Sequence, residues 1–387
     1  MKKKIAILGS TGSIGKSLIQ LVLKDRKKFD IQLLTAHKNY KLLLKQAKAL
    51  NVKNLIVSDK INYDKFKSLK LDKSYNIYNN YNSFNKIFNT KLDYAMCSIV
   101  GLDGLIPTLN IIKFTKNLAI ANKEAIICGW NLIQKNLNLY KTKFVPVDSE
   151  HFSIWSSMNY NLSKINKIYL TASGGPFYKK KFKTLKNVVI SDALNHPTWK
   201  MGKKISIDSA TLINKIFEII EAKKIFNIKY ENLSIVIHPK SYVHSIIKYE
   251  NGLINLVAHD TNMKIPILNS LNLKSMDIFL KNTIDLDKLN KPNFHQPKSI
   301  NFPLIKLLKK IPSTDSLFET ALVTANDYLV NLFLKNKIKF TEISKIMLKL
   351  VDTKKFKKYK YQYPSKIKMI LKTKNEVEFY LKKIHKI

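Results

Sequence analysis

The hydrophobic pattern of the first 150 residues alternates between short apolar runs and longer amphipathic stretches. Apolar runs typical of buried strands occupy residues 4–8, 31–35, 55–58, 95–100, 117–121 and 144–147. Helical periodicity predicts helices at residues 16–23, 41–50, 105–113 and 123–136. Because strands that alternate with helices usually form parallel sheets, the pattern predicts an α/β fold with helices on both faces of one sheet.

The pattern changes beyond residue 150 and indicates more than one domain, as expected for a chain of 387 residues. Strands are predicted at 168–171, 234–237 and 243–249, and a helix that follows residues 205–211 is predicted to end near residue 222. Prolines and weak periodicity favour a linker at 276–312, and the remainder is typical of amphipathic helices with lysine-rich faces. We therefore expect domains at 1–147, 148–275 and 313–387, with 276–312 as the linker.

A glycine-rich turn separates the first predicted strand from the first predicted helix. Gly9, Gly12 and Gly15 lie at intervals of three in this turn. A backbone without side chains can approach a pyrophosphate closely, and the following helix N-terminus supplies free N–H groups and a positive dipole end. The turn therefore predicts a dinucleotide-binding loop, and a plain tight turn is the alternative.

The end of the second predicted strand bears on the choice of dinucleotide. An NAD-binding fold usually places an acidic residue about 20 positions beyond the glycine loop, where it binds the ribose 2′-OH. This chain has His37, Lys38 and Asn39 there instead. A cation at Lys38 favours the 2′-phosphate of NADPH over NADH, and a surface lysine without this role is the alternative.

Two acidic residues, Asp148 and Glu150, follow the strand predicted at 144–147. On an extended backbone their spacing places both carboxylates on one side. Two carboxylates in one cleft repel each other unless a cation binds them, and a hard divalent ion such as Mg²⁺ or Mn²⁺ suits oxygen ligands. A solvated turn with two surface acids is the alternative.

A second polar group lies on the helix predicted after residue 211. Asn214, Lys215, Glu218 and Glu221 are spaced by three and four residues, so they share one face of that helix. An ion-paired structural helix shows the same spacing. The same face also suits a phosphate and a metal ion, and Glu218 would then complete a three-carboxylate site with the pair at 148 and 150.

Two loops in this part of the chain have compositions that suit ligand binding. Residues 172–177 are small and include Ser173, so they can present N–H and hydroxyl donors to an anion. Residues 196–204 form a basic loop that contains Trp199 and Gly202, which suits a lid that excludes water. The alternative for the second loop is a tryptophan that only packs on the core.

The net charge of +41 raises the question of nucleic acid as a partner. The basic residues are nearly all lysines spread along the chain, and Arg26 is the only arginine. Arginine is the residue that reads bases most often, so this composition argues against a nucleic-acid-binding protein, which is kept as the alternative from another class. A positive surface would also attract anionic substrates.

Cysteine content and hydropathy favour a cytoplasmic protein. Cys97 and Cys128 both lie in apolar surroundings and imply no disulfide framework, so we expect core thiols. The apolar run near residue 5 enters the glycine loop after about five residues and is too short for the core of a signal peptide. No uncharged apolar stretch is long enough for a transmembrane helix, and no membrane association is expected.

Seven segments occur in an order and spacing that resemble the 1-deoxy-D-xylulose 5-phosphate reductoisomerase family of the non-mevalonate isoprenoid pathway. They are LGSTGSIG, ANKEA, PVDSEH, LTASGGPF, HPTWKMGKKISIDSAT, NKIFEIIEA and IHPKSYVHS. The resemblance implies a homodimer whose subunits have a Rossmann-like NADPH domain, a central α+β catalytic domain and a C-terminal helical domain. It also implies isomerisation and NADPH-dependent reduction of 1-deoxy-D-xylulose 5-phosphate to 2-C-methyl-D-erythritol 4-phosphate.

The resemblance further implies roles for individual residues. The divalent metal, Mg²⁺ or Mn²⁺ with Co²⁺ as a further candidate, would be bound by Asp148, Glu150 and Glu218. Substrate contacts would come from Ser149, Glu150, Ser173, His196, Ser209, Asn214, Lys215 and Glu218, and the catalytic residues would be Lys123, Glu150 and His196. Cofactor contacts would come from Thr11, Gly12, Ser13, Ile14, Lys38, Asn39, Asn122, Lys123, Glu124 and Gly202.

The chain departs from the family pattern at a few positions. His37 stands where a glycine is usual, Thr198 and Lys200 replace Asn and Ser in the lid, and ANKEA replaces the commoner ANKES. These changes concern lid kinetics and cofactor affinity more than the reaction class. Another NADP-dependent, metal-assisted sugar-phosphate oxidoreductase is the alternative within enzymes.

Overall fold

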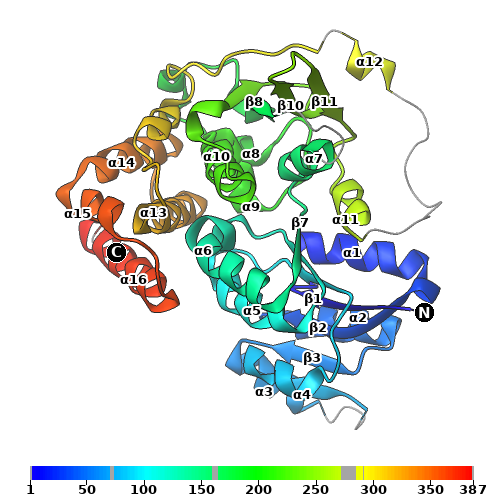
Figure 1. The fold of residues 1–387 in the computed structure, drawn as a ribbon. Helices are drawn as coiled ribbons and strands as arrows, with labels where there is room; N and C mark the ends of the chain where they lie inside the picture. Colours follow the sequence, from blue (N-terminus) through cyan, green and yellow to red (C-terminus); the bar gives the residue numbers. More distant parts are fainter. Residues whose placement is uncertain (1, 70–73, 159–163, 272–284, 291, 386–387) are drawn as a thin grey trace. The chain divides into compact units, whose positions relative to one another are not determined.

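The computed structural model describes residues 2–69, 74–158, 164–271, 285–290 and 292–385 (Figure 1). The chain divides into two compact units. The first comprises Met1–Ile126, Leu132–Phe152 and Met263–Asn282, and the second comprises Ile127–Asn131, Ser153–Asn262 and Thr283–Ile387. These units cut across the predicted domain boundaries, which stay a prediction.

The described residues of the first unit form a seven-stranded parallel sheet with the order β4-β3-β2-β1-β5-β6-β7. In the central pairing, Ile5 of β1 is opposite Ile31 of β2, and Ile7 is opposite Leu34. All predicted strands of this region are present, which confirms the α/β prediction, and β4 is an addition at the edge. The strands are β1 (Lys3–Leu8), β2 (Phe29–Ala36), β3 (Asn54–Val57), β4 (Asn76–Tyr78), β5 (Tyr94–Cys97), β6 (Asn117–Ile120) and β7 (Lys143–Pro146).

Helices between these strands bury their apolar faces on the sheet, as Leu18 and Leu43 do in the same core as Ile5. A late segment also joins this core, because Ile267 of α11 packs there and α11 lies against α1. The Tyr94 hydroxyl and Ser270 Oγ are 2.7 Å apart and link α11 to β5. The helices are α1 (Ser13–Lys24), α2 (Tyr40–Leu50), α3 (Lys60–Lys67), α4 (Phe84–Ile87), α5 (Leu105–Ile111), α6 (Lys123–Tyr140) and α11 (Lys264–Ser270).

The described residues of the second unit form a four-stranded mixed sheet with the order β11-β10-β8-β9. Strand β9 is parallel to β8, whereas β10 is antiparallel to β8 and to β11. Helix α10 (Ile213–Phe226) packs on this sheet through Ile219 and Ala222. The strands are β8 (Ile165–Ala172), β9 (Leu233–Ile237), β10 (Val243–Tyr249) and β11 (Ile254–Ala258).

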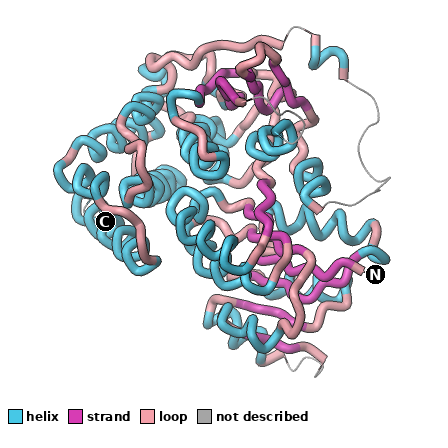
Figure 2. Tube along the Cα trace, in the orientation of Figure 1, coloured by secondary structure: helices cyan, strands magenta, loops and turns pink. Residues whose placement is uncertain are grey.

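The C-terminal part of the second unit is helical, as predicted (Figure 2). Ser316 and Glu319 form the expected capping box at the start of α13. Part of the expected linker is packed, since Pro303–Lys309 form a 3-10 helix with Leu304 and Leu307 buried, while residues 276–284 lie outside the described residues. The remaining helices are α7 (Ser149–Met158), α8 (Ile190–Leu194), α9 (Lys203–Ala210), α12 (Leu286–Leu289), α13 (Leu317–Leu334), α14 (Phe340–Asp352), α15 (Lys354–Lys357) and α16 (Ile367–His385).

Within the described residues, none of the helices combines the length and hydropathy needed to cross a bilayer. Cys97 and Cys128 are both buried free thiols, as expected from their apolar surroundings. Burial raises the pKa of Cys97 to about 12, although a hydrogen bond with Thr108 acts in the opposite direction. Both cysteines therefore behave as core residues.

Candidate active site

The glycine loop lies between β1 and α1, as the sequence predicts. Gly9 has a φ of 83°, and a Cβ added there would lie 2.8 Å from the Ser98 carbonyl oxygen. A Cβ at Gly15 would collide with the backbone of Gly9 and Ser10. Both glycines are thus required by close backbone packing at the start of α1.

Helix α1 begins at Ser13, three residues earlier than predicted, because the turn of the loop itself supplies its N-cap. Gly12 occupies that position and provides no side-chain cap. The N–H groups of the first turn therefore lack partners within the helix and are available to an anion. Thr11, Gly12, Ser13 and Ile14, the predicted cofactor contacts, all lie at this turn.

Neighbouring polar side chains hold the loop in place. Gln46 of α2 accepts a hydrogen bond from Ser10 Oγ at 2.7 Å and donates one to the Ser10 carbonyl at 3.0 Å. Thr35 Oγ1 accepts from the Gly9 N–H at 2.8 Å. These bonds leave the backbone of the loop with little freedom, which favours a preformed phosphate cradle.

The residues predicted to contact the adenosine end follow β2. Lys38 is exposed, and Asn39 caps α2 by accepting a hydrogen bond from the Leu42 N–H at 3.1 Å. His37 Nδ1 lies 3.0 Å from Ser58 Oγ, at the end of the neighbouring strand β3. The exposed ammonium of Lys38 is thus next to the β2 end, where a 2′-phosphate would be bound.

Asn122 is a structural cap at the start of α6. Its Oδ1 accepts from the Ala125 N–H at 2.7 Å, and its Nδ2 donates to the carbonyl oxygens of Ile99 and Gly101. The side chain is 4% exposed. It ties the loop after β5 to the helix that carries Lys123 and Glu124, which are also buried.

The backbone at Asp148 and Glu150 differs from the prediction. It is not extended, since α7 starts at Ser149 and the Asp148 carbonyl accepts the first helical hydrogen bond from the Phe152 N–H at 2.8 Å. Acidic residues favour the first turn of a helix because they complement its positive end. An extended backbone does not place these two carboxylates on one side, so that prediction is wrong, although Asp148 does follow β7.

Asp148 is surrounded by cationic and polar partners in the first unit. Its Oδ2 lies 3.2 Å from Lys123 Nζ, and its Oδ1 lies 3.7 Å from His151 Nδ1. Burial tends to raise the pKa of Asp148, but Lys123, followed by His151, lowers it well below its ordinary value. Asp148 therefore stays ionised. In the next two residues, Ser149 Oγ donates a hydrogen bond to Glu150 Oε2 at 2.5 Å.

In the second unit, Ser173 and His196 form a hydrogen-bonded pair. Ser173 Oγ lies 2.8 Å from His196 Nε2 and also accepts from the Gly175 N–H at 3.0 Å. His196 Nδ1 accepts from the N–H groups of Trp199 and Thr198 at 2.9 and 3.2 Å. Nδ1 is therefore unprotonated, Nε2–H donates to Ser173, and burial lowers the pKa of His196 to about 4.

Close packing brings the loop that follows β8 to the end of α9. Gly175 has a φ of 63°, and a Cβ there would lie 3.0 Å from Ala210 Cα and 3.2 Å from the Ser209 carbonyl oxygen. Ser173 and Ser209, two predicted phosphate contacts, are thereby held in neighbouring segments. Leu212, with a φ of 65°, then turns the chain into α10.

The predicted polar face of α10 is present. Asn214 Nδ2 and Lys215 Nζ each donate to Glu218, to Oε1 and Oε2 respectively, at 2.5 Å. Lys215 and Glu218 are 4% and 1% exposed. A buried carboxylate with both oxygens paired is stable only while these partners remain, so the three side chains form one unit.

The loop at 196–202 is held by polar and aromatic contacts in the second unit. The Trp199 ring meets His244 edge-on at 6.0 Å between centroids, and His244 stacks on His259 at 3.7 Å. Thr198 Oγ1 lies 3.1 Å from Ser241 Oγ. Gly202, which ends the loop, is the N-cap of α9.

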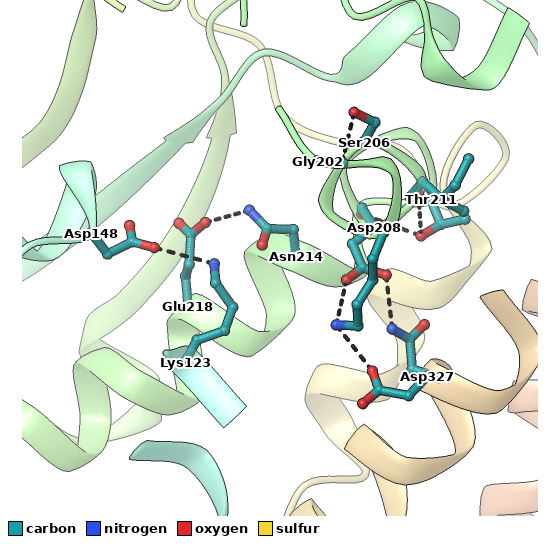
Figure 3. A network of polar contacts seen from close by, with 12 residues as sticks. Lys123, Asp148, Gly202, Ser206, Asp208, Thr211, Asn214, Glu218 and Asp327 are labelled. Carbon is teal, nitrogen blue, oxygen red and sulfur yellow. Dashed lines mark hydrogen bonds and ion pairs between the residues drawn. The ribbon is translucent and has the colours of Figure 1, made fainter. Parts of the chain in front are cut away.

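The sequence pattern did not reveal a polar cluster that joins α9 to α13, in which Asp208 and Asn326 are buried and Lys204 and Asp327 are partly exposed. Figure 3 shows Asp208 with a lysine and an amide at its two oxygens, and the members are Lys204, Asp208, Asn326 and Asp327. The i,i+4 spacing of Lys204 and Asp208 is a signal that the sequence does carry. The contact with α13 spans 118 residues and has no local signal.

Family models, curated relatives and solved structures that are similar to this chain all carry the name of one enzyme family. The model of 1-deoxy-D-xylulose 5-phosphate reductoisomerase matches residues 5–129, and that of its C-terminal domain matches 144–226. A model named DXP reductoisomerase C-terminal domain matches residues 259–379. A 1-deoxy-D-xylulose 5-phosphate reductoisomerase of Pelagibacter ubique (strain HTCC1062) is 55% identical over 368 residues, which cover 94% of this chain and 95% of the relative.

Other relatives and solved structures agree. The enzyme of that name from a Wolbachia sp. (subsp. Drosophila simulans) is 39% identical and covers 89% of both chains. The reductoisomerase of Zymomonas mobilis in complex with NADPH matches with a TM-score of 0.87 and 30% identity, over 100% of this chain and 99% of that one. A DOX-P reductoisomerase with NADPH, fosmidomycin and magnesium gives a TM-score of 0.88 at 30% identity, over 99% and 97%. The chain therefore belongs to the 1-deoxy-D-xylulose 5-phosphate reductoisomerase family.

Proposed function

We propose residue roles for the reaction of this family, the NADPH- and divalent-metal-dependent conversion of 1-deoxy-D-xylulose 5-phosphate to 2-C-methyl-D-erythritol 4-phosphate. The observation that carries the proposal is the cluster of Asn214, Lys215 and Glu218 on α10, in which the lysine and the glutamate are buried. It combines a cation, an amide and a carboxylate on one helical turn, a donor set that suits a phosphate next to a metal ion. The comparisons give no support to the nucleic-acid alternative.

The glycine loop and the end of β2 would bind NADPH. The uncapped first turn of α1 offers N–H groups to the pyrophosphate, and the exposed Lys38 offers a charge to the 2′-phosphate. When bound, NADPH supplies the hydride that reduces the rearranged substrate. Asn39, Asn122, Glu124 and Gly202 are further proposed contacts, and the side chain of Asn122 also caps α6.

Asp148, Glu150 and Glu218 would bind the divalent metal. Each is a hard oxygen donor, and the lowered pKa of Asp148 keeps that carboxylate charged, as a metal ligand requires. Bound Mg²⁺ or Mn²⁺ would act as a Lewis acid toward the oxygens of the substrate. Lys123 pairs with Asp148, and Lys215 pairs with Glu218. When the metal and the substrate bind, both ammonium groups would turn toward the anionic substrate.

Ser173, Ser209, Asn214 and Lys215 would bind the substrate phosphate, with His196 next to it. Neutral His196 donates its Nε2–H to Ser173 and so orients the serine hydroxyl without adding a positive charge. Ser149 would contact the carbon chain of the substrate. Binding at the phosphate, away from the reacting carbons, fixes the orientation of the substrate, and Trp199 in the neighbouring loop would exclude water.

We further propose a homodimer in the cytoplasm. The edge strand β11 exposes Ile254 and Leu256, and Leu253 precedes it, each close to half exposed or more. An apolar edge of this kind is usually covered by a partner, and a second copy of this chain fits the family. The two buried cysteines form no disulfide, which suits a reducing compartment.

The test is NADPH oxidation, followed by absorbance, with 1-deoxy-D-xylulose 5-phosphate and Mg²⁺ or Mn²⁺. We expect turnover that requires both substrate and metal and that prefers NADPH to NADH. Glu218→Gln should lose metal-dependent turnover and retain NADPH affinity, since it alters the metal ligand and leaves the glycine loop intact. Unchanged NADPH absorbance with the wild-type protein, or normal turnover of Glu218→Gln, would contradict the proposed roles.

A further inference from the structure

The polar cluster between α9 and α13 has a buried and fully paired carboxylate, Asp208, at its centre (Figure 3). Asp208 is 0% exposed, its Oδ1 accepts from Asn326 Nδ2 at 2.8 Å, and its Oδ2 accepts from Lys204 Nζ at 2.9 Å. Lys204 also lies 3.0 Å from Asp327. A buried charge that is bonded in two directions fixes both the rotation and the axial position of its helix.

Helix α13 is itself firmly held. Asn326 is 0% exposed, and most of the helix is buried. At its N-terminal end, Lys224 of α10 pairs with Asp315 at 2.7 Å, and Glu319 completes the capping box with Ser316. Because α13 contacts both α9 and α10, it can keep the distance and the angle between these two helices constant.

The placement of α9 relative to α10 affects the proposed phosphate site, because both helices contribute residues to it. Asp208 directly precedes Ser209, and α10 begins four residues after Ser209 with Lys215 in its first turn. The link between the helices is short and strained, because Leu212 has a φ of 65° and a buried side chain. Movement of α9 would thus shift Ser209 away from Lys215, and it would also shift the end of the loop at Gly202.

We propose that Asp208 and Asn326 are positioning residues that set the distance between Ser209 and the phosphate-binding side chains of α10. The inference rests on the proposed phosphate site. Neither residue touches the substrate, and both act through the backbone of α9. Loss of their hydrogen bond should impair binding of the phosphorylated substrate much more than binding of NADPH, because Gly202 is the one proposed NADPH contact that moves with α9 and the others lie in the first unit.

The experiment compares Asn326→Asp, Asn326→Ala and the reciprocal double variant Asp208→Asn/Asn326→Asp in the full-length enzyme. Asn326→Asp brings a second carboxylate against Asp208, and Asn326→Ala removes the donor. In the double variant, the amide at position 208 still accepts from Lys204 and donates to the new carboxylate. We expect kcat/KM for 1-deoxy-D-xylulose 5-phosphate to fall by about 10- to 100-fold in the single variants. The double variant should recover most of this loss, and KM for NADPH should change much less than KM for the substrate in all three.

A matched control separates positioning from stability. Tyr359→Phe removes a hydrogen bond of 2.7 Å to Glu376 of α16 and should lower the melting temperature without changing KM for the substrate. If Asn326→Ala lowers only the melting temperature, or if the double variant is no better than Asn326→Asp, the positioning role is refuted. If Lys215→Ala also leaves KM for the substrate unchanged, the proposed phosphate site fails as well. A strong effect of Lys215→Ala alone would reject only the positioning role.

Discussion

The glycine loop of the first unit and the Ser173–Ser209–Lys215 region of the second are both candidate phosphate sites, but they are built differently. The glycine loop relies on backbone N–H groups, and close packing at Gly9 and Gly15 sets its shape. The second region relies on side chains, and its lysine and histidine already have hydrogen-bonded partners.

The two sites should therefore tolerate different substitutions. A backbone site should fail when a side chain is added, because the added atoms displace the main chain. A side-chain site should fail when a charge or a donor is removed, because its partners are then left buried and unpaired.

Gly15→Val should have the largest effect. The new Cβ would overlap the backbone of Gly9 and Ser10, so NADPH affinity should fall by roughly 100-fold or more because the loop is displaced from its binding geometry. Fluorescence titration of NADPH measures this. At Gly12, the nearest atom to an added Cβ is 3.3 Å away, so Gly12→Ala should be milder, and equal losses in the two variants would contradict the packing argument.

Lys215→Met keeps the length of the side chain and removes its charge. Hydrogen bonds to charged groups contribute about 1.5–3 kcal/mol, so kcat/KM for the phosphorylated substrate should fall by about 100-fold. Glu218 would lose a buried partner, and the free energy of unfolding should fall by about 3 kcal/mol. Lys223→Met, on the same helix but paired with Asp315, is the control that should leave KM for the substrate unchanged.

Gly175→Ala tests the one place where the second site depends on backbone. The positive φ and the 3.0 Å approach to Ala210 should cost about 1–3 kcal/mol of unfolding free energy. We expect a rise of about 10-fold in KM for the substrate, because Ser173 would move away from Ser209. Urea unfolding and steady-state kinetics measure the two effects, and a normal KM with lowered stability would show that the loop adjusts.

His196 should give the smallest effect, visible in the pH dependence of stability. Its pKa is about 4 in the folded protein because of burial, below the ordinary value of 6.5. The unfolded chain therefore binds the proton more readily, so stability is full above about pH 6.5 and declines as the pH falls toward 4. His196→Gln should flatten this part of the curve of unfolding free energy against pH, and an unaltered curve would argue against a buried neutral imidazole.

The parts of the fold that the sequence predicts are those with local causes. The strand, glycine turn and helix at residues 3–24 follow from a short apolar run and three glycines, and the polar face of α10 follows from helical spacing. The capping box at Ser316 and Glu319 likewise depends on only four consecutive residues. Such features need no knowledge of what packs against them.

The parts that escaped prediction have distant or ambiguous causes. The sequence predicts Asp148 and Glu150 on an extended strand end, but the Asp148 carbonyl accepts from the Phe152 N–H and the segment is the start of a helix. Strand β11 shows little burial and becomes regular only by pairing with β10. The return of α11 to the core of the first unit, and the bond from Asn326 to Asp208, depend on tertiary packing across more than 100 residues.

The two buried cysteines have a practical consequence. Cys97 and Cys128 are each 2% exposed, and the pKa of about 12 at Cys97 leaves almost none of it as thiolate near neutral pH. Alkylating reagents and mild oxidants should therefore spare the folded enzyme, and inhibitors that rely on an electrophilic warhead for cysteine would find no accessible target. Reversible compounds that compete for the anion-binding groups are the more rational route to blocking this protein.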